Sequence, residues 1–250
     1  MKIELGDGER LDDLLIDGMK IIQNEREFCF SLDAVLLAHF AFVRKHYKVL
    51  DLGTGTGVMP LLLANKAAMI DALELNPVMA DLAARNMRLN QVEDKITVKE
   101  GDLRQIRSLY GPQQYDLVIC NPPYRPVAHG QINQLDGVAR ARHEVTANLT
   151  DVIAAASFAL KFRGRLAMVH LPERLGEIFA SMQAHKIVPK RLCFVHPRID
   201  REPTMVLVEG IAGGRPGGLR VEPPVVAHDD AGGYSNAVRK YFYKDGSCHE

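Results

Sequence analysis

The sequence predicts an α/β protein, a Rossmann-like domain built on a mostly parallel sheet. From about residue 48 onward, short apolar runs alternate with segments of helical periodicity, which is typical of repeated βαβ units. The first apolar run ends in a glycine-rich turn, 53–57, where open α/β sheets bind ligands. The last two apolar runs, 191–196 and 204–209, are close enough to pair antiparallel. We therefore expect a seven-stranded, mostly parallel sheet with a C-terminal antiparallel hairpin.

Each element of this core follows from a local pattern. Strands are predicted over residues 48–52, 69–75, 96–99, 115–120 and 165–170. Helices are predicted over residues 60–67, with a proline in the first turn, and over 77–89, about 151–161 and 173–185. Asn76 before Pro77 is expected to cap the second helix, and Thr150 or Asp151 the third.

The two ends of the chain are expected to add to this core. Residues 14–23 and 28–30 suggest a hairpin that turns at Asn24-Glu25-Arg26, and Ser31 is expected to cap a helix from about residue 32 to 44. The glycine-rich tail after Ile211 is expected to form a loop and short strands. The predicted parts are therefore an N-terminal hairpin and helix covering the ligand site (1–45), the core (46–210) and a tail packed on the core (211–250).

The composition excludes several classes of protein. The formal net charge is +0, so the chain as a whole has no attraction for nucleic acid or membrane, and any such contact needs a local basic patch. The four cysteines lie far apart and form no CxxC pair, which argues against a disulfide framework or a zinc site. No apolar signal region or membrane-length apolar run is present. We expect a cytoplasmic protein without metal, and the oligomeric state stays open.

The glycine-rich turn is preceded by an acid. Gly53, Gly55 and Gly57 allow positive φ and a close approach of the backbone to a ligand. This glycine pattern serves a dinucleotide or a nucleoside without phosphate. Asp51 favours the second ligand, because its carboxylate would repel a pyrophosphate but attract the ammonium group of an amino acid.

Two further acids lie at successive strand ends. Glu74 ends the second predicted strand, where a carboxylate can accept hydrogen bonds from ribose hydroxyls. Asp102 follows the third strand and can accept from an adenine amino group, while Leu103 offers an N–H or an apolar face. Each acid is equally suited to capping a helix, but their regular placement at successive strand ends indicates one ligand site.

The fourth strand ends in Asn121-Pro122-Pro123-Tyr124. The two prolines fix φ and lack N–H donors, so the turn is stiff. It can hold the Asn121 side chain and the Pro122 carbonyl in place to accept hydrogen bonds from an –NH2 group, and Tyr124 offers a flat face to a planar base or amide. The alternative is a proline-rich turn without chemistry.

Taken in order, Asp51–Gly57, Glu74, Asp102 and Asn121–Tyr124 resemble the motifs of class I S-adenosylmethionine-dependent methyltransferases over roughly residues 30 to 210. The Asn-Pro-Pro-Tyr motif resembles that of the amino-methyltransferases, which act on adenine N6, cytosine N4, guanine N2 or a glutamine amide. The chain is most similar to the small-domain methyltransferases that modify an adenine N6 beside the anticodon of tRNA(Val). That closer resemblance is carried by the N-terminal hairpin and by Ser31–Ala34, Ala141–Glu144 and Pro189–Leu192.

The resemblance implies S-adenosylmethionine as cofactor and tRNA, in its anticodon region, as partner. It implies that the segment near Asp33 folds over the cofactor, although Asp33 is equally suited as a first-turn helix acid. The implied roles are catalysis by Asn121, Pro122 and Tyr124, cofactor binding that also involves Asn121, and substrate binding by Pro123, Tyr124, Arg125, Arg140, Arg142 and His143. Basic residues near 186–201 and 239–244 are further candidates for RNA contact.

Several functions remain open at this level. The Asn-Pro-Pro-Tyr chemistry serves adenine in tRNA, a protein glutamine N5 as in release factors, and guanine N2 in rRNA. The basic loop after the motif and the lack of a separate helical N-terminal substrate domain favour RNA. The other classes are a NAD-binding oxidoreductase, which Asp51 disfavours, and a non-catalytic module that binds S-adenosylmethionine.

Overall fold

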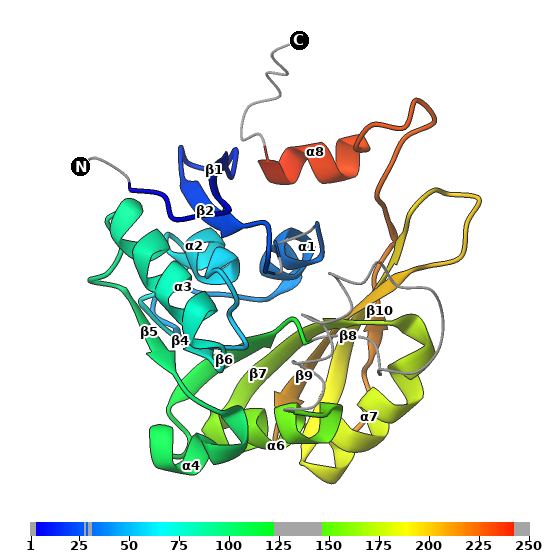
Figure 1. The fold of residues 1–250 in the computed structure, drawn as a ribbon. Helices are drawn as coiled ribbons and strands as arrows, with labels where there is room; N and C mark the ends of the chain where they lie inside the picture. The colour runs from blue at the N-terminus through cyan, green and yellow to red at the C-terminus, as the bar shows by residue number, and fades with distance from the viewer. Residues whose placement is uncertain (1–3, 28, 30–31, 123–146, 243–250) are drawn as a thin grey trace.

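The computed structural model describes residues 4–27, 29, 32–122 and 147–242. Within them, helices cover both faces of one nine-stranded sheet (Figure 1). Its order is β10-β8-β9-β7-β6-β3-β4-β5, with β11 beside β8. The strands are β3 (Lys48–Leu52), β4 (Met69–Glu74), β5 (Ile96–Glu100), β6 (Tyr115–Cys120), β7 (Leu160–His170), β8 (Ile187–His196), β9 (Met205–Ala212), β10 (Arg220–Val221) and β11 (Val225–Val226).

The predicted fold class is confirmed. Strands β3 to β7 run parallel, and β9 is antiparallel to both of its neighbours, β7 and β8, which is the expected C-terminal hairpin. The predicted count of seven strands is too low, because β10 and β11 in the tail add to the edge of β8. Short strands in the tail were expected, but their two residues each show no pattern that predicts their pairing with the main sheet.

Two helical layers enclose the sheet. One face is covered by α1 (Leu32–Phe40), α2 (Val58–Leu63), α3 (Pro77–Leu89) and α8 (Asn236–Phe242), and the other by α4 (Ile106–Leu109), α6 (Leu149–Ala159) and α7 (Leu175–Ala184). Short 3-10 turns, η1 (Leu103–Gln105) and η2 (Pro172–Arg174), precede α4 and α7. None of the helices in the described ranges is both long and apolar enough to span a bilayer.

The predicted cap is correct for α3 and wrong for α6. Asn76 caps α3 as predicted, because its side chain accepts from Val78 N at 2.9 Å and Pro77 takes the first helical position. The cap of α6 is Asn148, where Thr150 or Asp151 was expected. Asp151 instead completes a capping box by accepting from the Asn148 N–H at 3.0 Å.

The N-terminal hairpin does not turn where the sequence predicts. Its strands are β1 (Glu9–Asp13) and β2 (Lys20–Asn24), so the turn spans residues 14–19 and not Asn24-Glu25-Arg26. The apolar run 14–23 conceals a turn signal, Asp17-Gly18, and both residues have positive φ. Helix α1 also ends at Phe40, four residues before the predicted Arg44.

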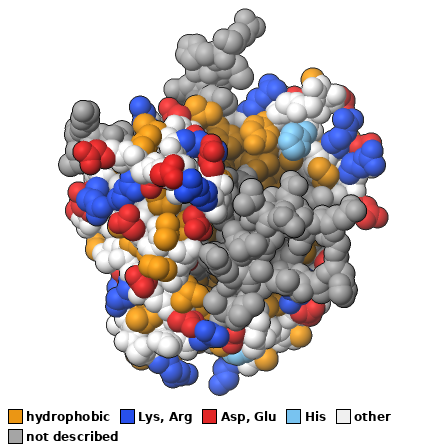
Figure 2. All heavy atoms as spheres, viewed as in Figure 1, with side chains coloured by type: hydrophobic (Ala, Val, Ile, Leu, Met, Phe, Trp, Pro, Cys, Tyr) orange, Lys and Arg blue, Asp and Glu red, His pale blue; other side chains and the backbone are white. Residues whose placement is uncertain are grey.

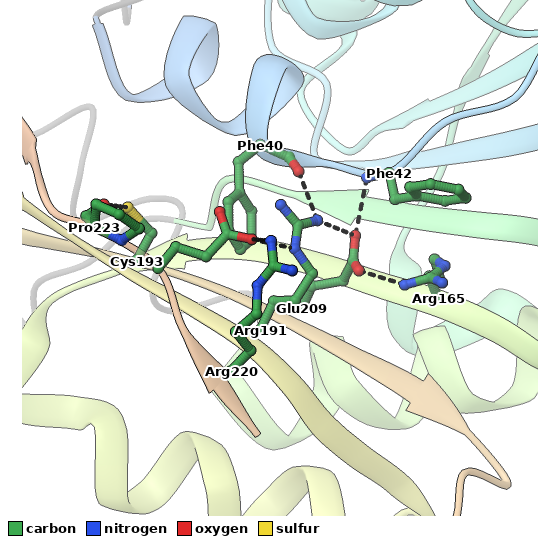
Figure 3. A network of polar contacts seen from close by, with 9 residues as sticks. Phe40, Phe42, Arg165, Arg191, Cys193, Glu209, Arg220 and Pro223 are labelled. Atoms are coloured by element: carbon green, nitrogen blue, oxygen red, sulfur yellow. Dashed lines mark hydrogen bonds and ion pairs between the residues drawn. The ribbon is translucent and has the colours of Figure 1, made fainter. Parts of the chain in front are cut away.

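A polar network around a buried acid connects the end of α1 and the start of the tail to the sheet (Figure 3). Glu209 in β9 is fully buried and accepts from Arg165 in β7 at 2.5 Å and from Arg191 in β8 at 3.3 Å. It also accepts from the Phe42 N–H at 2.9 Å, just after α1. Arg191 in turn donates to the Phe40 carbonyl and to Glu222 in the tail. The network therefore holds the end of α1 in place over the sheet.

Candidate functional site

The carboxyl ends of three neighbouring strands meet at one edge of the sheet. Leu52 at the end of β3 pairs with Leu73 in β4 and with Cys120 at the end of β6. The glycine turn after β3, Glu74 at the end of β4 and Asn121 after β6 therefore emerge side by side. This is the convergence that the strand-end motifs predict.

Side-chain alternation directs two of the acceptors to one face. Successive side chains of a strand point to opposite faces, so Asp51 shares the face of Val49 and Glu74 that of Ile70. Val49 and Ile70 belong to the core under α1, α2 and α3. The cofactor-binding candidates Asp51 and Glu74 thus lie on the same side of the sheet as α1, and Asn121 follows β6 directly at the same edge.

Asp51 is the electrostatically unusual group of the site. It is 0% exposed, and no described residue meets either of its carboxylate oxygens with hydrogen-bonding geometry. Burial raises the pKa of this carboxyl to about 7, the nearby Thr54 hydroxyl opposes the rise, and the charge of Glu74 adds to it. A buried carboxylate is costly unless it is paired. Asp51 is therefore suited to a cationic group of a ligand.

The glycines of the turn differ in what surrounds them. Gly53, Gly55 and Gly57 all have positive φ. A Cβ at Gly53 would meet nothing within 4 Å, whereas a Cβ at Gly57 would lie 2.6 Å from the Met87 side chain in α3. Gly57 therefore permits close packing of α3, while the open side of the turn lies at Gly53. The predicted contact of Gly57 with a cofactor stays a prediction.

Glu74 organises the turn and can still bind a ligand. It is 2% exposed, and its Oε2 accepts from the Gly55 N–H at 2.8 Å while its Oε1 accepts from the Asn76 N–H at 2.9 Å. Each carboxylate oxygen has a second lone pair. The acid therefore fixes the glycine turn against the start of α3 and retains acceptor capacity for ribose hydroxyls.

Asp102 has a structural partner. It caps η1, accepts from the Arg104 N–H at 2.9 Å and forms an ion pair of 2.6 Å with the Arg104 side chain, whose hydrogen bond lowers the pKa of the acid. The capping alternative is thus realised in the structure. Binding of adenine by Asp102, with Leu103 beside it, stays a prediction.

Asp33 lies in the first turn of α1 and is 6% exposed. Its helix packs on α2, which follows the glycine turn, and on β7. Pro122 is buried directly after Asn121. The other catalytic and substrate-binding candidates, Pro123, Tyr124, Arg125, Arg140, Arg142 and His143, lie outside the described residues.

Two buried polar residues near the site were not predicted from the sequence. Asn86 in α3 is 0% exposed and bonds to the backbone of β2 and of the glycine turn. The position of a polar residue on the apolar stripe of α3 is the pattern that could have indicated Asn86. His170 ends β7 beside β6; burial lowers its pKa to about 4, so the ring is neutral at physiological pH. Its Nδ1 accepts from the Leu171 N–H at 2.8 Å.

Comparison with known proteins identifies the family of this chain. The family described as "Methyltransferase small domain" matches residues 32–185. The chain belongs to this family. Among the described residues of this methyltransferase-family chain, no group of three or more His, Cys, Asp or Glu is arranged to hold a metal ion. A reaction without metal stays a prediction.

Two relatives and one solved structure illustrate the similarity. The tRNA1(Val) (adenine(37)-N6)-methyltransferase of Porphyromonas gingivalis is 33% identical over 64% of this chain and 64% of its own length. The protein of the same name from Tolumonas auensis is 34% identical over 70% of this chain and 73% of its own. A predicted O-methyltransferase from Agrobacterium tumefaciens has a TM-score of 0.66 at 23% identity, over 84% of this chain and 95% of its own, and shows the shared fold.

The cofactor of this family is S-adenosylmethionine, and the described residues fit it. The fully buried carboxylate of Asp51 suits its ammonium group, and the space beside Gly53 allows the backbone to approach it. The spare lone pairs of Glu74 suit its ribose. Cofactor binding by these three residues stays a prediction that their geometry supports.

Proposed function

We propose that this protein transfers a methyl group to the N6 atom of an adenine in tRNA, next to the anticodon. The observation that carries the proposal is the fully buried carboxylate of Asp51 beside Glu74, at the sheet edge where Asn121-Pro122 begins. The relatives named as tRNA adenine methyltransferases support the choice of substrate. A tRNA substrate would also place the protein in the cytoplasm.

The chain's own residues would act by positioning. S-adenosylmethionine, when bound, supplies an electrophilic methyl group on a sulfonium. The lone pair of an adenine amino group is delocalised into the ring, which makes the nitrogen a weak nucleophile. Asn121 Oδ1 and the Pro122 carbonyl would accept hydrogen bonds from its two N–H groups and favour tetrahedral geometry at the nitrogen, so that the lone pair is localised and faces the methyl group. Preorganised acceptors of this kind need no reorganisation during the reaction.

The tRNA would approach the same edge of the sheet. Since β8 and β7 are both antiparallel to β9, the β8–β9 connection lies at the edge that carries Asn121. Figure 2 shows charges of both signs over the N-terminal hairpin, and the β8–β9 connection likewise combines Arg198 and Arg201 with Asp200 and Glu202. Arg198 in this connection forms ion pairs with Asp200 and Asp230. The side chain of Arg201 is 71% exposed, and its ion pair with Asp200 is long, at 4.0 Å.

The RNA surface can be tested through salt. Arg201→Gln is expected to weaken tRNA binding and to reduce the slope of log affinity against log salt by about 1, because one phosphate contact is lost. The matched control is Arg163→Gln near the start of β7, at the opposite edge, which should leave the slope unchanged. Filter binding from low to physiological salt measures both. Equal slopes for Arg201→Gln and the unmodified protein would remove this surface from the proposal.

Cofactor binding is expected to depend on pH through Asp51. The ammonium group of the ligand requires the ionised carboxylate, and the pKa of Asp51 in the free protein is about 7. The pKa of Asp51 is therefore lower in the complex than in the free protein. Binding of the ligand releases a proton, and the affinity rises with pH. Affinity for S-adenosylhomocysteine should increase about tenfold from pH 6 to 8 and level off above. Calorimetry in buffers of different ionisation enthalpy would also show the proton release.

Two controls isolate this effect. Methylthioadenosine lacks the amino-acid part, so its affinity should not change with pH over the same range. Asp51→Asn should abolish the pH dependence and weaken S-adenosylhomocysteine binding roughly 10- to 100-fold, the cost of losing a charged hydrogen bond. If both ligands showed the same pH profile, Asp51 would not contact the ammonium group.

The decisive experiment for the function uses undermodified tRNA and labelled S-adenosylmethionine, followed by nucleoside analysis. We expect N6-methyladenosine in the anticodon loop. A release factor and rRNA serve as the alternative substrates. Label that enters a glutamine of the release factor, or guanine in rRNA, but not the tRNA would overturn the proposed substrate.

A further inference from the structure

The Asn86 side chain joins three parts of the fold that are far apart in sequence. Its Oδ1 accepts from the Ile22 N–H in β2 at 2.6 Å. Its Nδ2 donates to the Ile22 carbonyl at 3.0 Å and to the Thr56 carbonyl in the glycine turn at 2.9 Å. Both amide hydrogens are thus used, one on the hairpin and one on the turn. At 0% exposure no water can replace these bonds.

Asn90 makes a comparable but simpler contact one helical turn later. Its Oδ1 accepts from the Lys20 N–H at 3.0 Å and its Nδ2 donates to the Lys20 carbonyl at 2.7 Å. Residues four apart on a helix and two apart on a strand edge face the same way. Asn86 and Asn90 therefore dock the outer edge of β2 on α3. Of the two side chains, Asn86 is the one that continues to the glycine turn.

Two other contacts connect the hairpin to the cofactor site. Ile22, Met79 and Leu82 form one apolar cluster between β2 and α3, and the Met79 side chain comes within 3.6 Å of where a Cβ on Gly55 would be. Glu27, just after β2, accepts from the Asn76 side chain at 3.3 Å, and the Asn76 N–H donates to Glu74. The hairpin thus contacts the neighbours of both the glycine turn and the ribose-binding candidate.

We propose that Asn86 is a positioning residue that couples docking of the β1–β2 hairpin to the conformation of the cofactor turn. The proposal rests on the proposed function, because it requires the cofactor to bind at that turn. With the hairpin docked, Asn86 is fixed from one side and orients the Thr56–Gly57 peptide from the other. With the hairpin displaced, the amide loses two of its three bonds and the glycine-rich turn gains conformational freedom. Hairpin docking and cofactor binding therefore favour each other.

Matched substitutions separate this coupling from docking alone. Asn86→Leu removes the bonds to both the hairpin and the turn. Asn90→Leu removes two bonds to the same strand and one to the Asn86 carbonyl, and it removes no bond to the turn. Titration with S-adenosylhomocysteine should show affinity about tenfold lower for Asn86→Leu, as expected for the loss of one or two buried hydrogen bonds. For Asn90→Leu the loss should stay below about threefold. Equal losses in the two variants, or none in Asn86→Leu, would overturn the proposal.

A second measurement needs no substitution and covers the case in which Asn86→Leu fails to fold. Coupling between two sites is reciprocal. Saturating S-adenosylhomocysteine should therefore slow hydrogen exchange of the β1–β2 amides, including that of Ile22, while α7 on the opposite face serves as the internal control. Unchanged exchange in β1–β2 at saturation would refute the coupling alone. A failure of the unmodified protein to bind S-adenosylhomocysteine would refute the cofactor site and the coupling together.

Discussion

Asn121→Ala is expected to lower kcat for tRNA methylation by about 10²–10³-fold, the usual cost of removing one preorganised hydrogen-bonding group from an active site. Asn121 follows β6 at the edge shared with Asp51 and Glu74, which places it next to the proposed cofactor site. The loss should fall on kcat more than on KM, because the interaction matters most as the nitrogen becomes tetrahedral in the transition state. Single-turnover kinetics with saturating cofactor and tRNA measure it.

Binding of S-adenosylhomocysteine provides the control for this variant, and its affinity should change far less than kcat. Asn65→Ala is the matched substitution of the same residue type; Asn65 bonds to Asp17 on the surface and should leave kcat unchanged. Full methyl transfer by Asn121→Ala would exclude the proposed role. Loss of transfer together with cofactor binding would indicate a disturbed fold at the end of β6.

Arg191→Met is expected to reduce the free energy of unfolding by roughly 2–3 kcal/mol, the range expected for the loss of hydrogen bonds that involve a charged group. The substitution leaves the fully buried Glu209 with Arg165 as its remaining cation and removes the donor to the Phe40 carbonyl. It also removes the guanidinium that lies 4.3 Å from the centre of the Phe40 ring. Urea denaturation monitored by circular dichroism measures the loss.

Arg198→Met is the matched control, since its ion pairs lie on the surface and the side chain is 46% exposed. Exposed pairs of this kind contribute about 0–1 kcal/mol. An Arg191→Met variant as stable as Arg198→Met would show that the network does not anchor α1 energetically.

Local spacing was sufficient to predict much of this molecule. The order of strands and helices, the Asn76-Pro77 cap and the fourth strand before Asn121 all follow from patterns within a few residues. The positions of the glycine turn and of Glu74 at strand ends also follow, because parallel strands joined by helices bring their carboxyl ends to one edge. These features depend on backbone geometry and hydrophobic periodicity, which neighbouring residues control.

Contacts between distant residues decided the rest. The addition of the two tail strands to the edge of β8 was not predicted. Asn86 meets Ile22 across 64 residues, and Glu209 meets Phe42 across 167. The raised pKa of Asp51 likewise arises from burial by surrounding elements. Burial and partner choice are properties of packing in three dimensions, and so they emerged only once the whole chain was folded.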